Sequence, residues 1–360
     1  MIKLLIVDDS ALMRRQLTTV FQGESDFVIR QARNGKEAVL ENRDFQPDVV
    51  TLDINMPEMD GITALSLIMV ERPVPVVMVS SLTEKGALAT FEALNLGAVD
   101  YIAKPGGTIS LSIADIRDEL VAKVRTAARA RLKSKTANAG LALRLRKERQ
   151  QLAAQRLPAA ARPSRRGSVG AGVVVIGVST GGPRTLEAIL PFLHADYPWP
   201  VLVAQHMPAA FTPTFAERLN KLCALKVVEV SAPMVIETGY IYIARGGADM
   251  LVVERAGKAT LIPKPESKEV LWHPSVDLLG RSLLEHYDPA RIVGVLLTGM
   301  GYDGADALAA IKSRGGRTIA ESEETAVVFG MPAELIERSG ASVVLRAEKI
   351  AAQLNSWAGL

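Results

Sequence analysis

Three polar residues stand at the ends of three apolar runs in the second half of this 360-residue chain. Ser179 lies in GVSTGG after the run VVVI, His206 follows VLVAQ, and Asp303 comes just past VGVLLTG. These are the residue types of nucleophilic acyl transfer, in which the histidine takes the serine proton and the aspartate orients the histidine. Because the carboxyl ends of parallel strands meet at one crevice, the three side chains are expected to converge there. The pattern predicts a hydrolase.

The segment GVSTGG allows two interpretations. Gly177, Ser179 and Gly181 fit the G-x-S-x-G nucleophile elbow, but the chain order Ser, His, Asp is not that of the α/β-hydrolases, so that fold is not expected. Main-chain N–H groups of the TGMG turn, Met300 first, are the expected oxyanion donors. The alternative is a phosphate cradle at a helix N-terminus. It lacks a Walker lysine and leaves the histidine and the aspartate without a role.

The predicted base and acid have rivals elsewhere in the sequence. His273, in WHPSVD, is the main alternative base, and Asp277 and Asp306 are weaker alternative acids. Asp303 could also cap the helix expected to open at Gly304, alone or in combination with catalysis.

A second set of polar residues follows apolar runs in the first third of the chain. Asp8 and Asp9 end the first run, Asp53 the third and Ser80 the fourth, and Lys104 follows the fifth. Clustered carboxylate oxygens favour Mg²⁺. A metal beside an aspartate permits phosphoryl transfer, in which Asp53 attacks while the metal and the Lys104 ammonium stabilise the negative charge.

Alternating apolar runs and helical periodicity predict βα units on both sides of a basic segment. The first part predicts a flavodoxin-like, five-stranded parallel sheet, with strands at 4–7, 27–29, 49–52, 76–79 and 99–102. The second predicts a doubly wound, mostly parallel α/β domain, with strands at 173–178, 200–205, 226–230, 292–297 and 316–320. Period-two alternation over 240–262 predicts antiparallel hairpins inserted in that sheet or added to its edge. The expected domains are residues 1–122 and 169–360.

The charge of the chain is uneven. The formal net charge is +3, but the linker expected over 123–168 holds fourteen Lys or Arg and one acidic residue, which leaves −10 for the other residues. Such a linker could contact an acidic partner or domain face, bind nucleic acid, or act as a solvated tether. Stacking aromatics and a recognition motif are absent from it, so nucleic acid is not an expected partner.

The rest of the composition indicates a cytoplasmic protein. The single cysteine, Cys223, excludes an intrachain disulfide. The first residues do not form a secretory signal, and no apolar run reaches the roughly eighteen residues of a membrane span.

The motifs IVDDS, LDINMP, VSS and AKP resemble the receiver domain of bacterial response regulators, over the whole of the first domain. The resemblance implies that Asp53 is the phosphoacceptor. It implies that Asp9, Asp53 and the backbone carbonyl of Asn55 bind Mg²⁺, with Asp8 acting through water. It also implies a set that contacts the phosphoryl group or switches with it: Ser80, Lys104 and the aromatic Tyr101.

The second domain resembles the catalytic domain of the protein-glutamate methylesterases of bacterial chemotaxis, the CheB family. The motifs that carry this resemblance are GVSTGG, QHMPAAFTPTFAERLN, HPSVDLL, LLTGMGYDGA and VVFGMP. The resemblance implies a triad of Ser179, His206 and Asp303, with Thr180 and Met300 beside it and no cofactor. The implied reaction hydrolyses glutamate γ-methyl esters on chemoreceptor helices and deamidates glutamines there.

The two resemblances together imply partners and a form of control. The implied partners are methyl-accepting chemoreceptors as substrate and a CheA-type histidine kinase as phosphodonor, with only peripheral contact with membrane-bound receptor arrays. The unphosphorylated receiver is expected to pack over the esterase cleft, and phosphorylation of Asp53 is expected to loosen it. Two departures from common family forms flank the expected cleft: ARGG at 244–247 in place of APGG, and Trp272 in the segment where HRPS is common.

Overall fold

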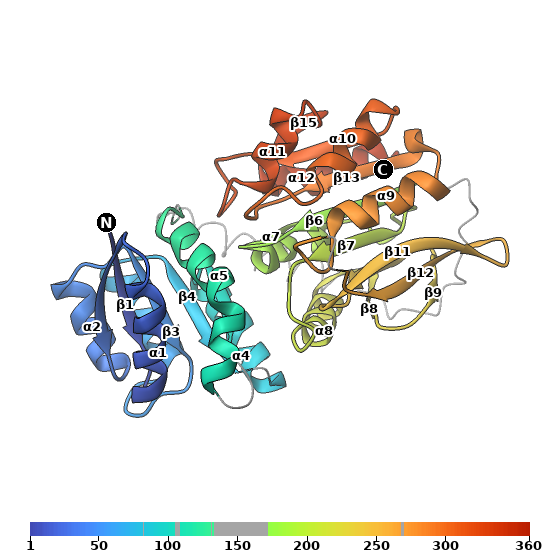
Figure 1. Ribbon diagram of the computed structural model, residues 1–360. Helices are drawn as coiled ribbons and strands as arrows, with labels where there is room; N and C mark the ends of the chain where they lie inside the picture. Colours follow the sequence, from blue (N-terminus) through green and yellow to red (C-terminus); the bar gives the residue numbers. More distant parts are fainter. Residues whose placement is uncertain (82, 105–108, 131, 133–171, 268–269) are drawn as a thin grey trace.

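The computed structural model describes residues 1–81, 83–104, 109–130, 132, 172–267 and 270–360. These residues form two α/β domains, which lie on the left and on the right of Figure 1. The predicted α/β class is confirmed for both. Within the described part of the chain, no helix is long and apolar enough to cross a membrane.

The N-terminal domain is a parallel sheet in the order β2-β1-β3-β4-β5, as predicted. Its elements alternate along the chain: β1 Ile2–Val7, α1 Ala11–Gln22, β2 Phe27–Ala32, α2 Gly35–Asp44, β3 Val49–Asp53, α3 Gly61–Glu71, β4 Val76–Ser80, α4 Glu84–Leu96, β5 Asp100–Ala103 and α5 Ile109–Ala128. The helices α1 to α4 each begin behind a side chain that accepts a main-chain N–H of the first turn, which fixes where they start. These caps are Ser10, Asn34, Asp60 and Thr83.

The helix α5 continues past residue 122, where the first domain was expected to end. Val124 and Ala127 are fully buried in its last turns, so the apolar face of the helix extends into the basic segment. Most of the expected linker, residues 133–168, lies outside the described residues.

The C-terminal domain is built on a seven-stranded sheet in the order β15-β14-β13-β6-β7-β10-β8, in which every described pair is parallel. Its elements are β6 Val173–Val178, α7 Gly182–Ile189, η1 Leu190–Phe192, β7 Val201–Gln205, α8 Thr212–Leu222, β8 Lys226–Val230, β9 Met234–Val235, β10 Tyr240–Ala244, β11 Ala248–Arg255, β12 Lys258–Pro265, α9 Val276–His286, η2 Pro289–Arg291, β13 Ile292–Leu296, α10 Ala305–Ser313, β14 Arg317–Glu321, α11 Met331–Glu337, β15 Val343–Leu345 and α12 Ala347–Trp357.

The hairpin prediction for 240–262 holds only for its second half. β11 and β12 pair in antiparallel fashion and form a separate small sheet with β9. The prediction was wrong for β10, which lies between β7 and β8 as a parallel strand. Ile241, Tyr242 and Ile243 are all buried, so both faces of this strand are covered, as is usual in parallel sheets.

The order of strands in the second sheet reverses at β6. From β6 the chain moves through β7 towards one edge, and after α9 it returns to place β13, β14 and β15 on the other side. Ligand sites of open α/β sheets lie outside the carboxyl ends of the strands at such a reversal. Ser179, His206 and Asp303 follow β6, β7 and β13, so the fold places all three beside this point.

The two domains contact each other through buried aromatic side chains. Tyr101 of β5 stacks on Phe211, with ring centroids 4.9 Å apart. Phe91 of α4 stacks on Phe215 of α8 at 5.4 Å. Figure 1 shows α4 and α5 on the side of the N-terminal domain that faces α7 and α8. The edge of the first sheet is therefore joined to the segment that follows the predicted base.

Candidate active site and phosphoryl-acceptor pocket

Ser179 occupies the turn between β6 and α7. Its N–H donates to the carbonyl oxygen of Thr298 at 2.9 Å, which ties the turn to the loop after β13. A Cβ on Gly299 would lie 2.7 Å from Ser179 Cβ and 2.3 Å from Met331 Sδ, so this loop can approach only as glycine. Gly181 has φ +78°, a left-handed conformation that favours glycine. The two glycines explain how the turn brings the hydroxyl close to the second loop.

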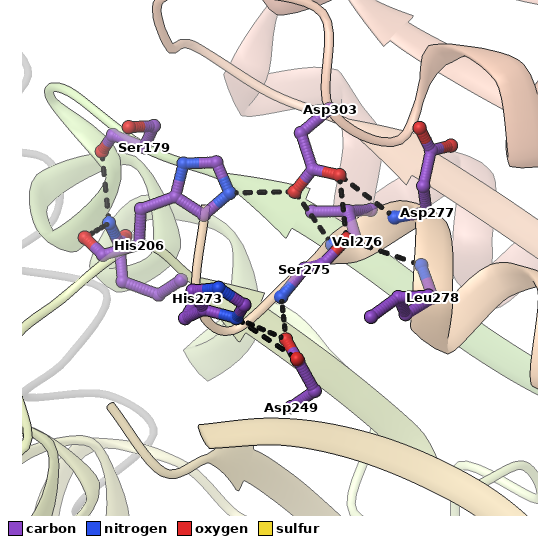
Figure 2. A network of polar contacts seen from close by, with 10 residues as sticks. Ser179, His206, Asp249, His273, Ser275, Val276, Asp277, Leu278 and Asp303 are labelled. Atoms are coloured by element: carbon purple, nitrogen blue, oxygen red, sulfur yellow. Dashed lines mark hydrogen bonds and ion pairs between the residues drawn. The ribbon is translucent and has the colours of Figure 1, made fainter. Parts of the chain in front are cut away.

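The His206 side chain directs one ring nitrogen to Asp303 and the other towards Ser179. Its Nε2 lies 2.8 Å from Asp303 Oδ2, whereas its Nδ1 is buried without a hydrogen-bond partner and faces Ser179 in Figure 2. An ionised carboxylate can only accept, so the shared proton belongs to Nε2 and Nδ1 carries a free lone pair. This is the tautomer that a general base acting on Ser179 requires.

Asp303 is held at the N-terminus of α9. Its carboxylate accepts the main-chain N–H groups of Val276 at 2.7 Å and Asp277 at 3.0 Å, and the hydroxyl of Ser275 at 3.0 Å. Burial by itself would raise the pKa of Asp303. The hydrogen bond and charge of His206 and the two N–H groups outweigh burial and lower that pKa. The carboxylate therefore stays ionised beside the imidazole.

The suggestion that Asp303 caps the helix after it is wrong. α10 begins behind Gly304, which has φ +89° and no side-chain cap. The left-handed glycine turns the chain so that the carboxylate points to the start of α9 instead, where it satisfies N–H groups of a different helix.

The rival residues have other partners. His273 Nδ1 lies 2.9 Å from Asp249 Oδ2, and Figure 2 shows this pair below the bonds made by Asp303. The Asp277 carboxylate accepts a main-chain N–H in the first turn of α10. Asp306 pairs with Arg338 at 2.7 Å near the surface. Among the described residues, none of these three rivals forms a side-chain hydrogen bond or ion pair with the serine and histidine of the predicted triad.

Two residues beside Ser179 are contacted from the N-terminal domain. The Thr180 hydroxyl donates to Asp100 Oδ2 at 2.6 Å, and the Thr126 hydroxyl lies 3.0 Å from Met300 Sδ. The main-chain N–H groups of Thr180 and Met300 donate to no acceptor in the part of the chain that the structure describes. They can therefore bind an oxyanion without breaking a bond within that part.

The two segments that differ from the common family sequence, at Trp272 and at 244–247, lie near the predicted base His206. The Trp272 ring is parallel to the His206 imidazole, with centroids 6.0 Å apart, and Tyr302 meets the indole edge-on at 4.9 Å. Gly301 makes room for the indole, because a Cβ there would lie 2.6 Å from Trp272 Cζ2. In the 244–247 segment, Gly246 packs closely against the loop that follows His206.

The carboxylates of the first domain form a pocket at the end of its sheet. Asp8, Asp9 and Asp53 each offer an oxygen within 4.8 Å of the others. Lys104 Nζ lies 3.0 Å from Asp8 Oδ2 and 2.9 Å from Asp53 Oδ2. Burial, with a smaller contribution from Asp8, raises the pKa of Asp53 despite the ammonium beside it. Burial would lower the pKa of Lys104, but the two carboxylates raise it overall. Three carboxylates against one ammonium are a donor set that fits a hard divalent cation.

The other predicted receiver residues lie around this pocket. Ser80 is buried, and its hydroxyl donates to the carbonyl oxygen of Gly86 in α4 at 3.2 Å. Asn55 is exposed in the loop after β3. Tyr101 is buried at the domain contact, and its hydroxyl has no hydrogen-bond partner there. The serine is thus engaged with α4, and the aromatic ring with the C-terminal domain through Phe211.

Several contacts of the site involve residues that sequence reasoning did not select. Ser275 binds Asp303, Asp100 binds Thr180, and Gln205 contacts the turn after β6. Each carried the same signal, a polar residue inside or at the end of a buried apolar segment: PSV, VDYI and VLVAQ. That signal marks a buried polar group, but it does not identify the group that it binds.

Two family descriptions match the chain. Residues 174–354 match the CheB methylesterases, and residues 4–114 match the response regulator receiver domain. Protein-glutamate methylesterase/protein-glutamine glutaminase 3 of Rhodospirillum rubrum is 56% identical over 359 residues, which cover 99% of this chain and 96% of that one. The corresponding enzyme 2 of Rhodopseudomonas palustris is 52% identical over 362 residues, with 99% and 98% covered. The crystal structure of the Thermotoga maritima CheB methylesterase catalytic domain is 39% identical, has a TM-score of 0.50, and matches over 52% of this chain and 99% of that chain.

Proposed function

The chain belongs to the CheB methylesterase family and carries a response regulator receiver domain, and from this premise we propose that phosphorylation of Asp53 controls an esterase site made of Ser179, His206 and Asp303. It is a protein-glutamate methylesterase and protein-glutamine glutaminase of the chemotaxis response regulators. The observation that carries the proposed mechanism is the orientation of the imidazole, with Nε2 on an ionised carboxylate and Nδ1 free towards Ser179.

The proposed reaction uses the triad twice. Ser179 Oγ attacks the γ-carbonyl carbon of the methyl ester, and His206 Nδ1 takes the hydroxyl proton. The tetrahedral intermediate expels the methoxy group, which receives that proton and leaves as methanol. Water then attacks the glutamyl-serine ester, His206 again accepts the proton and returns it to Ser179, and a glutamate side chain is released. With glutamine, the same steps release ammonia.

The charge that develops on the carbonyl oxygen requires fixed donors. The main-chain N–H groups of Met300 and Thr180 are the proposed oxyanion donors because they flank Ser179 and are free in the described part of the chain. The side chains of these two residues are also contacted from the N-terminal domain, Thr180 by Asp100 and Met300 by Thr126. Access to the oxyanion site is therefore proposed to depend on the position of the receiver.

Removal of the nucleophile tests the proposed mechanism. The wild-type chain and Ser179→Ala are compared for methanol release from membranes that contain methylated chemoreceptors. Methanol release should fall by about 10⁴-fold or more in Ser179→Ala. His206→Ala should lose activity similarly, whereas His273→Ala, which removes the rival base, should retain most of it. Equal methanol release by wild type and Ser179→Ala would exclude this nucleophile.

Control by phosphorylation is proposed to act through Ser80 and Tyr101. To reach a phosphoryl group on Asp53, the Ser80 hydroxyl has to leave Gly86 in α4, the helix that carries Phe91 to the domain contact. Tyr101 is the next residue after Asp100, which binds Thr180 beside the nucleophile. A change at β4 and β5 therefore reaches both the aromatic contact and the turn that holds the serine.

The remaining parts of the proposal concern cofactor, partners and location. We assign Mg²⁺ to Asp9, Asp53 and the carbonyl oxygen of Asn55, with Asp8 acting through water and Lys104 contacting the phosphoryl group. The metal would neutralise charge during phosphoryl transfer. The proposed phosphodonor is a CheA-type kinase, the proposed substrates are methyl-accepting chemoreceptors, and the proposed location is the cytoplasm. We propose 1–122, 123–168 and 169–360 as the receiver, linker and catalytic segments, with the start of the linker, up to Ala128, continuing helix α5 of the receiver.

A further inference from the structure

Gln205 is a buried side chain that joins the proposed nucleophile to the proposed base. It is the last residue of β7, directly before His206, and only 1% of it is exposed. Its Nε2 donates to the main-chain carbonyl oxygen of Ser179 at 3.0 Å and to that of His206 at 3.0 Å. One carboxamide nitrogen thus holds the main chain of the two residues whose side chains exchange a proton.

The orientation of this carboxamide follows from its surroundings. If the group were reversed, its oxygen would face two carbonyl oxygens, which cannot donate. As it stands, Oε1 is buried without a hydrogen-bond partner and packs against Gly182, where a Cβ would lie 2.0 Å from it. An unsatisfied buried acceptor destabilises a fold. An apolar side chain of similar length would avoid that cost, so simple packing does not account for glutamine here.

The two carbonyl oxygens end neighbouring strands. β6 and β7 are paired up to Val178 and Gln205, and the His206 N–H donates to the Val178 carbonyl oxygen at 3.1 Å. Beyond this bond the strands separate into the turns that carry the serine and the histidine. Gln205 bridges the two turns at the point where strand pairing stops, through the main chain of both functional residues.

We propose that Gln205 is a positioning residue of the esterase, which fixes the distance between the Ser179 hydroxyl and His206 Nδ1. This inference rests on the proposed triad. A displacement of about 1 Å in reacting groups can cost on the order of 100-fold in rate. Because Gln205 holds main chain and is buried from substrate, its loss lowers kcat and leaves KM unchanged.

The test measures kcat and KM for methanol release by the full chain, in the presence of a phosphodonor. Gln205→Met keeps the length of the side chain and removes both donors, and kcat should fall about 10- to 100-fold with KM within about twofold of wild type. Gln205→Asn keeps a carboxamide that is one methylene shorter, and its kcat should lie between those of wild type and Gln205→Met.

Thr318→Val is the matched control. Thr318 is also fully buried, and its hydroxyl bridges the Gly340 carbonyl oxygen and the Ser342 N–H at the other end of the sheet. This variant should lower the unfolding temperature while kcat stays within about twofold of wild type, because the loss concerns stability alone. A kcat of Gln205→Met equal to that of Thr318→Val, or a change in KM alone, would overturn the inference.

Two further outcomes remain decisive. If Gln205→Met does not fold, Gln205→Asn carries the test, and wild-type kcat in that variant overturns the inference. Ser179→Ala is assayed beside these variants. Methanol release by Ser179→Ala equal to wild type removes the proposed triad, whereas an inactive Ser179→Ala together with fully active Gln205 variants removes only the role of Gln205.

Discussion

At the scale of single residues, Asp303 is fixed by groups other than the histidine it serves. The N–H groups of Val276 and Asp277 and the hydroxyl of Ser275 hold both carboxylate oxygens. The position of the side chain is therefore set by α9, and its charge acts on His206. Oδ2 accepts from both Val276 and His206, so an asparagine that turns its amide nitrogen to the imidazole keeps the Ser275 and Asp277 bonds on its oxygen and gives up the Val276 bond.

Asp303→Asn tests the role of that charge. The amide can keep one oxygen on α9, but it turns an N–H towards His206 Nε2, which moves the imidazole proton to Nδ1 and blocks the base. By analogy with the Ser-His-Asp proteases, kcat for methanol release should fall about 10³- to 10⁴-fold.

Asp277→Asn serves as the comparison for Asp303→Asn. Asp277 is a buried carboxylate on α9, the helix whose N-terminus holds Asp303, and its side chain binds a main-chain N–H of α10 rather than the imidazole. Its kcat should remain within about threefold of wild type. Similar losses in the two variants would show that disruption of α9, and not the charge on Asp303, causes the effect.

The sequence was sufficient to propose Ser179, His206 and Asp303, because each of the three follows an apolar run, and the structure brings His206 and Asp303 into contact. It could not select the partners of Asp303. They precede it by 26 to 28 residues, and two of them act through main-chain N–H groups, which carry no sequence signature. Gln205 was missed for a related reason, since its function depends on two carbonyl oxygens that any residue would provide.

At the scale of elements, the strand positions were predictable wherever an apolar run was long and bounded. The assignment of β10 failed because local alternation in YIYIA is typical of a hairpin, whereas its neighbours in space, β7 and β8, cover both of its faces. The register of a parallel sheet depends on such distant neighbours. The aromatic contacts of Phe91 and Phe211 carry no sequence signal for the same reason, because their partners belong to the other domain.

The α4 contact offers a direct test of inhibition by the receiver. Phe91 stacks on Phe215 of α8, and such ring pairs contribute about 0.5–1.5 kcal/mol beyond apolar burial. Phe91→Leu keeps an apolar side chain but loses the stack. Basal methanol release without a phosphodonor should therefore rise about 2- to 10-fold, while the rate with a phosphodonor stays near that of wild type.

Phe21→Leu is the control for this element. Phe21 packs edge-on against Phe27 inside the receiver, with centroids 5.0 Å apart, and its partner is not in the C-terminal domain. This variant should lose stability without a rise in basal activity. If Phe21→Leu and Phe91→Leu raise basal activity equally, loosening of the receiver and not the domain contact is responsible.

At the scale of the whole molecule, the proposed phosphoacceptor pocket and the proposed serine site are joined through one edge of the receiver. Asp100, Tyr101 and Thr126 touch residues beside the nucleophile or the segment that follows the base. The resemblance to known families predicted that the receiver packs against the catalytic domain, but the residues in contact could not be predicted, because each half of the sequence satisfies its own pattern without the other. In this proposal, phosphorylation shifts the equilibrium between a state in which the receiver covers the esterase site and a state in which the site is open. Each tenfold gain in the open state requires about 1.4 kcal/mol of preferential stabilisation by the phosphoryl group.

The most direct test is the ratio of kcat/KM for methanol release with and without a small-molecule phosphodonor in Mg²⁺, measured for wild type and Asp53→Asn. The ratio should be about tenfold or more for wild type and near one for Asp53→Asn, which lacks the proposed phosphoacceptor. Chelation of Mg²⁺ should abolish the wild-type increase. An equal increase in both proteins, or none in wild type, would contradict control of Ser179 by Asp53.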